Sequence, residues 1–296
     1  MSQALPARGR RPPLTARGRR PPLNKDTRVC ISLAARPSNI GTRFHNYLYD
    51  QLGLDYLYKA FTTTDIAAAI SGVRALGIRG CSVSMPFKKD VIDLVDEVEP
   101  SARAIDAVNT IVNDLSVPGG RLVASNTDYL AVQELVERLN PDDAVLIRGS
   151  GGMAKAVGAA LRDKGFSNGT VVARNPETGR ALADTLGYAY APQVGTLTAP
   201  ILVNVTPIGM ADGPDEHRSA FEPATIAAAG TVVDVVAMPA ETPLIAAARA
   251  AGVPVITGAE VIALQAAEQF ERYTGVRPTR EQVAAASAFS RQVATA

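Results

Sequence analysis

Short apolar runs alternate with amphipathic stretches along most of the chain. The first apolar runs are RVCISL, YLYKAF and IRGCSVS. Residues 42–52 and 65–76 carry apolar positions at the 3.6-residue spacing of helices, and a further helix is predicted to open at Pro86. Glycines mark the joins between these segments. The order predicts β-α units and therefore an α/β protein with a mostly parallel sheet.

The alternation restarts after a predicted hairpin, IDAVNTIVND followed by RLVAS. The predicted strands of this second part are AVLIRG, TVVAR, ILVNV and TVVDVV, and its predicted helices cover residues 127–139, 153–164, 177–186 and 244–251. These elements predict a second α/β domain. Two final amphipathic stretches, 259–273 and 279–293, have no strand after them and could cap either domain.

The first 23 residues do not follow this pattern. The segment ARGRRPPL at Ala7–Leu14 recurs word for word at Ala16–Leu23. The region carries six arginines and no acid, so the net charge of +1 becomes −5 without it. A basic arm can bind nucleic acid or a membrane surface. Five prolines and no large aromatic residue favour instead a disordered extension over residues 1–24, with no nucleic-acid or membrane partner.

Composition narrows the class of protein further. With 296 residues, 47% of them hydrophobic and 20% charged, the chain matches a globular protein of about two domains. No run approaches the length of a membrane span, and no apolar core follows the N-terminal arginines as in a secretory signal, so we expect a cytoplasmic protein. Two cysteines and two histidines are too few for a disulfide framework or a zinc finger. We therefore expect no metal site.

The sharpest local signal is AVLIRGSGGMAKAVGAAL, in which an apolar strand runs through a glycine-rich turn into a helix. Such a turn lets backbone amides approach a pyrophosphate at the helix N-terminus. The usual GxGxxG pattern is only partly kept, because Ala154 occupies the last glycine position. The next strand ends in Arg174, where an NAD enzyme usually has Asp or Glu. Arginine suits a 2′-phosphate, so the pattern favours NADP, although an unliganded turn and a surface arginine are the plain alternatives.

A dinucleotide site implies hydride transfer, which needs a group that handles a proton. No tyrosine has lysine four residues later, which disfavours the Tyr/Lys short-chain arrangement. Lys88, in CSVSMPFKK, follows a buried strand, where open parallel sheets hold ligands, whereas Lys89 is typical of a solvated side chain. Asp128 could simply cap a helix. Asn109 and Gln265 are polar residues among apolar ones and need partners, which the backbone could supply.

Several segments together resemble the shikimate dehydrogenase family over nearly everything after Lys25. They are FHNYLYDQLGLDY, SVSMPFKK, AVNTI, NTD, GSGGMAKA, NVTPIGM and GAEVIALQAAEQFERYTG. The chain is most similar to the divergent shikimate dehydrogenase-like branch, because PSNIGTRFHN replaces the usual SxSP segment before HN. The resemblance implies a substrate domain of residues 25–125 and 258–296, and a Rossmann-like NADP domain of residues 126–257.

The resemblance also implies roles for individual residues. Lys88 and Asp128 would be the catalytic pair. The substrate-binding positions would be Asn39, Ser84, Asn109, Asp128 and Gln265, and the cofactor-binding positions Gly149, Ser150, Gly151, Gly152, Met153, Arg174 and Gly258. Two departures stand out: the family's two substrate-carboxylate serines align with Asn39 and Gly41, and its tyrosine aligns with Ala237.

The implied activity is reversible hydride transfer between NADP and a ring hydroxyl of shikimate or a related cyclic hydroxy acid, within aromatic amino acid biosynthesis. Lys88 would shuttle the hydroxyl proton and Asp128 would orient it. Because Gly41 and Ala237 supply no hydroxyl, we expect weak turnover of shikimate itself, unless Ser38, Asn39 or Thr42 in the same segment replaces the lost donors. A quinate- or aminoshikimate-type dehydrogenase and a non-catalytic NADP-binding sensor are the alternatives. The residues do not decide between a monomer and a homodimer.

Overall fold

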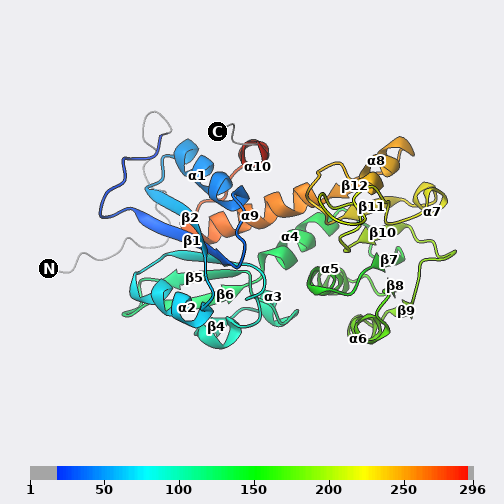
Figure 1. Ribbon diagram of the computed structural model, residues 1–296, viewed down its shortest axis with the longest axis horizontal. Coiled ribbons are helices and arrows are strands. Elements are labelled where there is room, and N and C mark those ends of the chain that lie inside the picture. The colour runs from blue at the N-terminus through cyan, green and yellow to red at the C-terminus, as the bar shows by residue number, and fades with distance from the viewer. Residues whose placement is uncertain (1–18, 293–296) are drawn as a thin grey trace. The chain divides into compact units, whose positions relative to one another are not determined.

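The computed structural model describes residues 19–292, and the chain forms two compact units, each built on a six-stranded sheet (Figure 1). Of the described residues, unit 1 contains those up to Thr127 and again from Ala266, and unit 2 contains Asp128–Gln265. Two α/β sheets were expected, and the structure confirms that fold class. Helices α4 (Thr127–Val136) and α9 (Gly258–Thr274) contribute residues to both units, so the unit boundaries fall inside helices. The substrate and NADP domains expected to meet near residues 126 and 258 stay a prediction.

The sheet of unit 1 has the strand order β2-β1-β3-β5-β6-β4. Strand β1 is parallel to both β2 and β3, whereas β5 is antiparallel to β3 and to β6. The predicted hairpin is therefore present as β5–β6. The strands of unit 1 are β1 (Arg28–Ala34), β2 (Tyr56–Thr62), β3 (Gly80–Val83), β4 (Glu97–Val98), β5 (Thr110–Asp114) and β6 (Arg121–Ser125).

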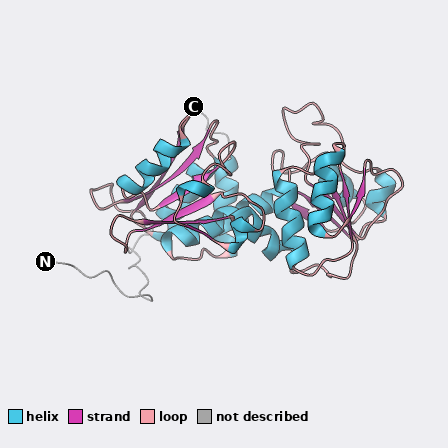
Figure 2. Ribbon diagram, turned by 90° about the horizontal axis from the view of Figure 1, so that it is seen from below, coloured by secondary structure: helices cyan, strands magenta, loops and turns pink. Residues whose placement is uncertain are grey.

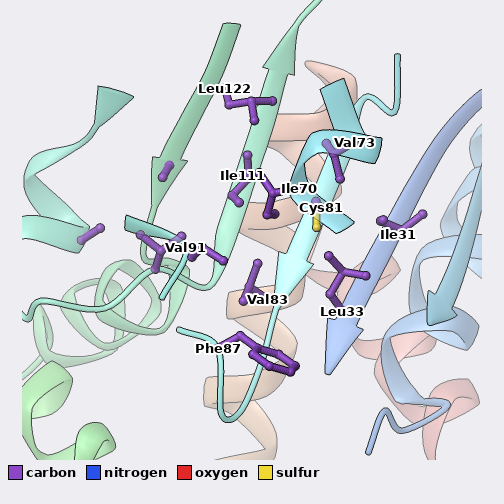
Figure 3. Close-up of a cluster of buried hydrophobic side chains, with 13 residues drawn as sticks. Ile31, Leu33, Ile70, Val73, Cys81, Val83, Phe87, Val91, Ile111 and Leu122 are labelled. Carbon is purple, nitrogen blue, oxygen red and sulfur yellow. The ribbon is translucent and has the colours of Figure 1, made fainter. Parts of the chain in front are cut away.

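One face of this sheet packs against helix α2 (Ile66–Ala75), which begins where the side chain of Asp65 accepts a hydrogen bond from the Ala68 amide. Alternate residues of each strand point to this face. Figure 3 shows them gathering with α2 residues in one buried cluster that includes Ile31, Cys81 and Ile70. Burying each such aliphatic side chain stabilises the fold by about 1.5–3 kcal/mol. The cluster makes this sheet a rigid support for the loops at its edge.

The opposite face carries an aromatic cluster from α1 (Ile40–Leu52), β2 and α9. The ring of His45 stacks on Tyr58 with centroids 4.3 Å apart, and Tyr49 stacks on Phe270. Burial lowers the pKa of His45 to about 3, so this histidine is neutral at physiological pH. Helix α10 (Arg280–Arg291) packs on α1 and starts with a capping box at Thr279.

Unit 2 has an entirely parallel sheet in the order β12-β11-β10-β7-β8-β9. Strand β7 is central. Strands β8 and β9 lie on one side of it and β10, β11 and β12 on the other, which is the Rossmann arrangement. Its strands are β7 (Val145–Arg148), β8 (Gly169–Val172), β9 (Ala189–Ala191), β10 (Ile201–Asn204), β11 (Thr231–Asp234) and β12 (Val255–Thr257). Its sheet-covering helices (Figure 2) are α5 (Gly152–Asp163), α6 (Pro176–Leu186), α7 (Pro223–Ala227) and α8 (Pro243–Ala250).

Two expectations need correction. Residues 85–91 form turns and not the helix expected from Pro86, because the Lys88 carbonyl accepts a hydrogen bond from the Val108 amide outside the segment. A short 3₁₀ helix, η1 (Ile92–Leu94), and the single turn α3 (Pro100–Arg103) follow.

No helix in the described part of the chain is long and apolar enough to cross a membrane.

The basic N-terminal segment is the second correction. Arg20 donates hydrogen bonds to the Asn46 side chain (2.9 Å) and to the Tyr56 carbonyl (3.1 Å), and its Nε lies 3.3 Å from a carboxylate oxygen of Asp50. The expectation of a disordered tail up to residue 24 is therefore wrong for residues 19–24, because Arg20 finds polar partners on α1 and β2. The first repeat, Ala7–Leu14, lies outside the described residues.

Candidate active site

Three of the expected site residues, the catalytic candidate Lys88 and the substrate-binding candidates Ser84 and Asn109, lie at one edge of the sheet of unit 1. At this edge β1, β3 and β6 end and β5 begins. Ser84 directly follows β3, and its amide bonds to the Leu33 carbonyl. The Asn109 carbonyl accepts from the Val83 amide (2.8 Å), and the Lys88 carbonyl accepts from Val108 (2.7 Å). These backbone bonds bring Ser84, Lys88 and Asn109 together at the carboxyl edge, where parallel sheets bind ligands.

The two adjacent lysines differ as the sequence predicted. Lys89 is exposed and forms an ion pair with Asp106 at 2.7 Å. Lys88 is half-buried in the turn beside the strand edge. An exposed surface pair of this kind contributes little to stability. Lys88 is therefore the less exposed lysine of the pair, and its catalytic role stays a prediction.

Asn109 fixes the start of α4, the helix that carries Asp128 in its first turn. Its Oδ1 accepts hydrogen bonds from the amide of Thr127 (2.8 Å) and from the hydroxyls of Thr127 and Thr110. These three donors fill the acceptor atom, while its amide nitrogen donates no hydrogen bond within the described residues. That nitrogen is the group that a ligand hydroxyl could use. Asp128 is 8% exposed and belongs to unit 2, so its pairing with Lys88 stays a prediction.

Sequence reasoning missed Gln269, which is more deeply buried than Gln265. Gln269 is 3% exposed, and its Nε2 donates to the hydroxyls of Thr110 (2.9 Å) and Ser82 (3.2 Å). Gln265, one helical turn earlier on α9, is half-buried and lies in unit 2. The segment VIALQAAEQF could have indicated Gln269, because this residue lies four residues after Gln265 and therefore on the same helix face. Asn39, the remaining expected substrate residue, is exposed at the N-cap of α1 and makes no side-chain cap bond.

In unit 2 the glycine-rich turn joins β7 to α5, beside β10 at the point where the strand order reverses. Gly149 has φ +126°, a conformation that favours glycine, and a Cβ there would lie 2.9 Å from Val205. Gly151 and Gly152 face open space instead, with nothing within 4 Å of an added Cβ. Gly151 caps α5 without a side chain. This end of α5 therefore offers free room and backbone amides to an anion.

The end of β8 adds positive charge near this turn. Arg174 is exposed. Burial lowers the pKa of Arg148 at the end of β7, and the positive charges of Arg218 and Arg174 lower it further. The hydroxyls of Ser150 and Thr178 lie 2.8 Å apart and join the turn to the first turn of α6. Open glycines, a helix N-terminus and an exposed arginine fit a dinucleotide that carries a 2′-phosphate.

Two other expected cofactor residues flank these elements. Met153 is half-buried in the first turn of α5. Gly258 is buried, and a Cβ there would lie 2.4 Å from the Val236 carbonyl oxygen and 2.5 Å from that of Val235. Glycine is required at position 258 by the packing of α9 against the chain after β11. Among the described residues, no group of three His, Cys, Asp or Glu side chains could hold a metal ion.

Known proteins show the same combination of elements. The substrate-binding domain of shikimate dehydrogenase matches residues 39–111. A shikimate dehydrogenase-like protein of Haemophilus influenzae is 56% identical over 270 residues, which are 90% of this chain and 98% of that protein. The chain belongs to the shikimate dehydrogenase family. This is a family of oxidoreductases that act on CH–OH groups.

Solved structures of the family share the fold. The shikimate 5-dehydrogenase of Thermus thermophilus, in complex with NADP(H) and shikimate, is 28% identical with a TM-score of 0.78, covering 89% of this chain and 99% of that one. The quinate dehydrogenase of Corynebacterium glutamicum, in complex with NAD, is 26% identical with a TM-score of 0.80, covering 89% and 98%. The family thus includes members with different acids and different cofactors.

Proposed function

We propose that this protein is an NADP-linked dehydrogenase that transfers hydride reversibly between the cofactor and a ring hydroxyl of shikimate or a related cyclic hydroxy acid. The observation that carries the proposal is the placement of half-buried Lys88 beside Asn109 at the carboxyl edge of unit 1. Binding a cofactor needs neither residue at that edge. Their presence supports an enzyme over a sensor.

Unit 2 would hold the cofactor. The amides at the start of α5 would bind the pyrophosphate, and Arg174 would bind the 2′-phosphate. When bound, NADP would accept the hydride that leaves the hydroxyl-bearing carbon of the substrate. The Thermus enzyme, which was solved with NADP(H), supports this choice of cofactor over NAD.

Unit 1 would hold the acid. Lys88 Nζ would take the proton of the substrate hydroxyl as its carbon loses hydride, which leaves a ketone, and would return the proton in the reverse direction. Asp128 would hold Lys88 and a substrate hydroxyl in reacting geometry. The Asn109 amide nitrogen would donate to an oxygen of the substrate. The exposed Ser84 and the half-buried Gln265 would be further contacts.

In this site the carboxylate of shikimate would have fewer hydrogen-bond partners than the family pattern provides. Asn39 and Gly41 stand where the family pattern has serines, so we expect kcat/KM for shikimate below about 10⁴ M⁻¹s⁻¹, the lower end of the enzyme range. Quinate and aminoshikimate carry the same carboxylate and are the alternative substrates for the same residues.

An absorbance screen for NADPH formation with shikimate, quinate and aminoshikimate tests the proposal. The Lys88→Ala variant should lose about 10²- to 10⁴-fold in kcat on the best acid, while Lys89→Ala should stay near wild type. Equal losses in both variants, or a loss below about tenfold in Lys88→Ala, would remove Lys88 from the mechanism. NADP binding without turnover of any of these acids would instead favour the sensor.

A further inference from the structure

The start of α1 leaves a gap in the substrate site that the proposed function assigns to unit 1. The family pattern puts a hydroxyl-bearing side chain at position 41, and this chain has glycine there. A Cβ built on Gly41 would lie 3.5 Å from the phenolic oxygen of Tyr58 and 3.6 Å from its Cε1. The Tyr58 hydroxyl is thus in van der Waals contact with the place where a serine side chain would begin.

Tyr58 is held firmly in that position. Its ring stacks on His45 with an interplanar angle of 7° and is 2% exposed. Its backbone is fixed by Asn46, whose side chain accepts from the Tyr58 amide (3.2 Å) and donates to the Tyr58 carbonyl (2.7 Å). A donor held this way loses little entropy when it binds a ligand.

Two serine hydroxyls flank the phenol on the same face of the sheet. Ser32 on β1 is in register with Ser82 on β3, and both are half-buried. Burial raises the pKa of Tyr58, and the neighbouring Ser32 and Ser82 side chains oppose this rise. The phenol therefore stays protonated at physiological pH and can donate a hydrogen bond.

The charge around this point suits an anion. The first turn of α1 contains no acidic side chain, and its N-cap residue Asn39 makes no side-chain cap bond. The positive end of the helix dipole is therefore not neutralised by a carboxylate of this first turn. One carboxylate oxygen could accept from the phenol and the other from a serine hydroxyl.

Resting on the proposed function, we propose that the Tyr58 hydroxyl, beside Gly41 and flanked by Ser32 and Ser82, binds the carboxylate of the cyclic acid substrate. This phenol supplies one of the hydroxyl contacts that positions 39 and 41 lack. Tyr58 is thus a substrate-binding residue that determines specificity for an acid over a neutral analogue.

The test compares Tyr58→Phe with the control Tyr56→Phe. Tyr56 lies on the same strand, but its hydroxyl donates to the Tyr273 carbonyl. Steady-state kinetics would use shikimate and its methyl ester, which lacks the charge. Tyr58→Phe should lower kcat/KM for shikimate by about 10- to 100-fold, the loss expected for a hydrogen bond to a carboxylate, mainly through KM. The ester should be almost unaffected, and Tyr56→Phe should change neither.

Rescue separates binding from folding. The 3.5 Å contact leaves room for a serine, so the double variant Gly41→Ser with Tyr58→Phe should recover most of the lost kcat/KM. An unchanged KM in Tyr58→Phe, an equal loss for acid and ester, or a failure of Gly41→Ser to rescue would overturn the inference.

Calorimetric titration of shikimate, quinate and aminoshikimate into the same variants separates this inference from the proposed reaction. If wild type binds one of the three acids but turns over none of them, the reaction fails, while a weaker Kd for that acid in Tyr58→Phe still supports the subsite. If wild type binds none of the three acids, the subsite is overturned as well.

Discussion

Substituting Gly258 separates a packing requirement from a cofactor contact at one position. An alanine Cβ would sit 2.4 and 2.5 Å from two backbone carbonyl oxygens, about 1 Å inside normal contact. The backbone that carries them is fixed, because the Val235 amide bonds to the Asn204 carbonyl and the Val236 amide bonds to Asp234 Oδ1. The clash between the added Cβ and these oxygens could be relieved only by moving the start of α9 away from the chain after β11. We expect Gly258→Ala to destabilise unit 2 by about 2 to 3 kcal/mol, as overpacked sites do.

Two measurements follow this change. The melting temperature should fall by roughly 6 to 12 °C. Amide hydrogen exchange should become faster in peptides from β10 and β11 and stay unchanged in peptides from β1 and β3, because the clash lies within unit 2. Gly72→Ala is the control, since its Cβ meets nothing within 4 Å inside α2, and it should stabilise by about 0.5 to 1 kcal/mol.

A third variant gives the opposite profile. A Cβ on Gly151 meets nothing within 4 Å, so Gly151→Ala should keep wild-type stability but weaken NADP binding, because the methyl group enters the space that the pyrophosphate needs. Wild-type melting in Gly258→Ala together with weakened NADP binding would refute the packing argument and make Gly258 a cofactor contact alone.

Three further outcomes are expected. Arg174→Ala should reduce the preference for NADP over NAD in kcat/KM by about 10- to 150-fold, the value of a charge-assisted hydrogen bond, and a wild type that prefers NAD would contradict the assignment. Burial raises the pKa of Cys30 to about 12 and raises that of Cys81, so neither thiol should react with a disulfide reagent at pH 8 until urea unfolds the chain; rapid labelling of native protein would contradict this. Arg20→Ala should lower stability by about 1 to 2 kcal/mol through its lost bonds to α1 and β2, whereas Lys25→Ala, which removes an exposed pair with its neighbour Asp26, should have no effect.

Periodicity in the sequence predicted the long elements well. The helices expected at residues 42–52 and 65–76 are α1 and α2, because an apolar stripe of three turns is distinct from a strand pattern. The order of strands and helices also predicted both α/β sheets. Strands β9 and β12 were missed, because three residues are too few to show an alternation.

The position of a candidate residue on the fold was predictable where its motif follows a strand, and less so where tertiary contacts decide it. Lys88 and the glycine-rich turn follow apolar strands, so their places at the sheet edges followed from the sequence. Gln269 and the Tyr58 of the proposed carboxylate subsite were not predicted, because polar groups in an apolar pattern look like core positions until their partners across the sheet are known. Arg20 was missed for the same reason, since a low-complexity segment does not show which of its charges finds a partner.

The most direct test of the proposed reaction is the transfer of deuterium from the acid to the cofactor. Shikimate, quinate and aminoshikimate labelled at their hydroxyl-bearing ring carbons would be incubated with NADP and the protein, and the NADPH formed would be analysed by mass spectrometry. We expect deuterated NADPH from at least one acid with wild type and with Lys89→Ala, and far less with Lys88→Ala. NADPH without deuterium, or no NADPH from any of the three acids, would contradict hydride transfer from a cyclic hydroxy acid.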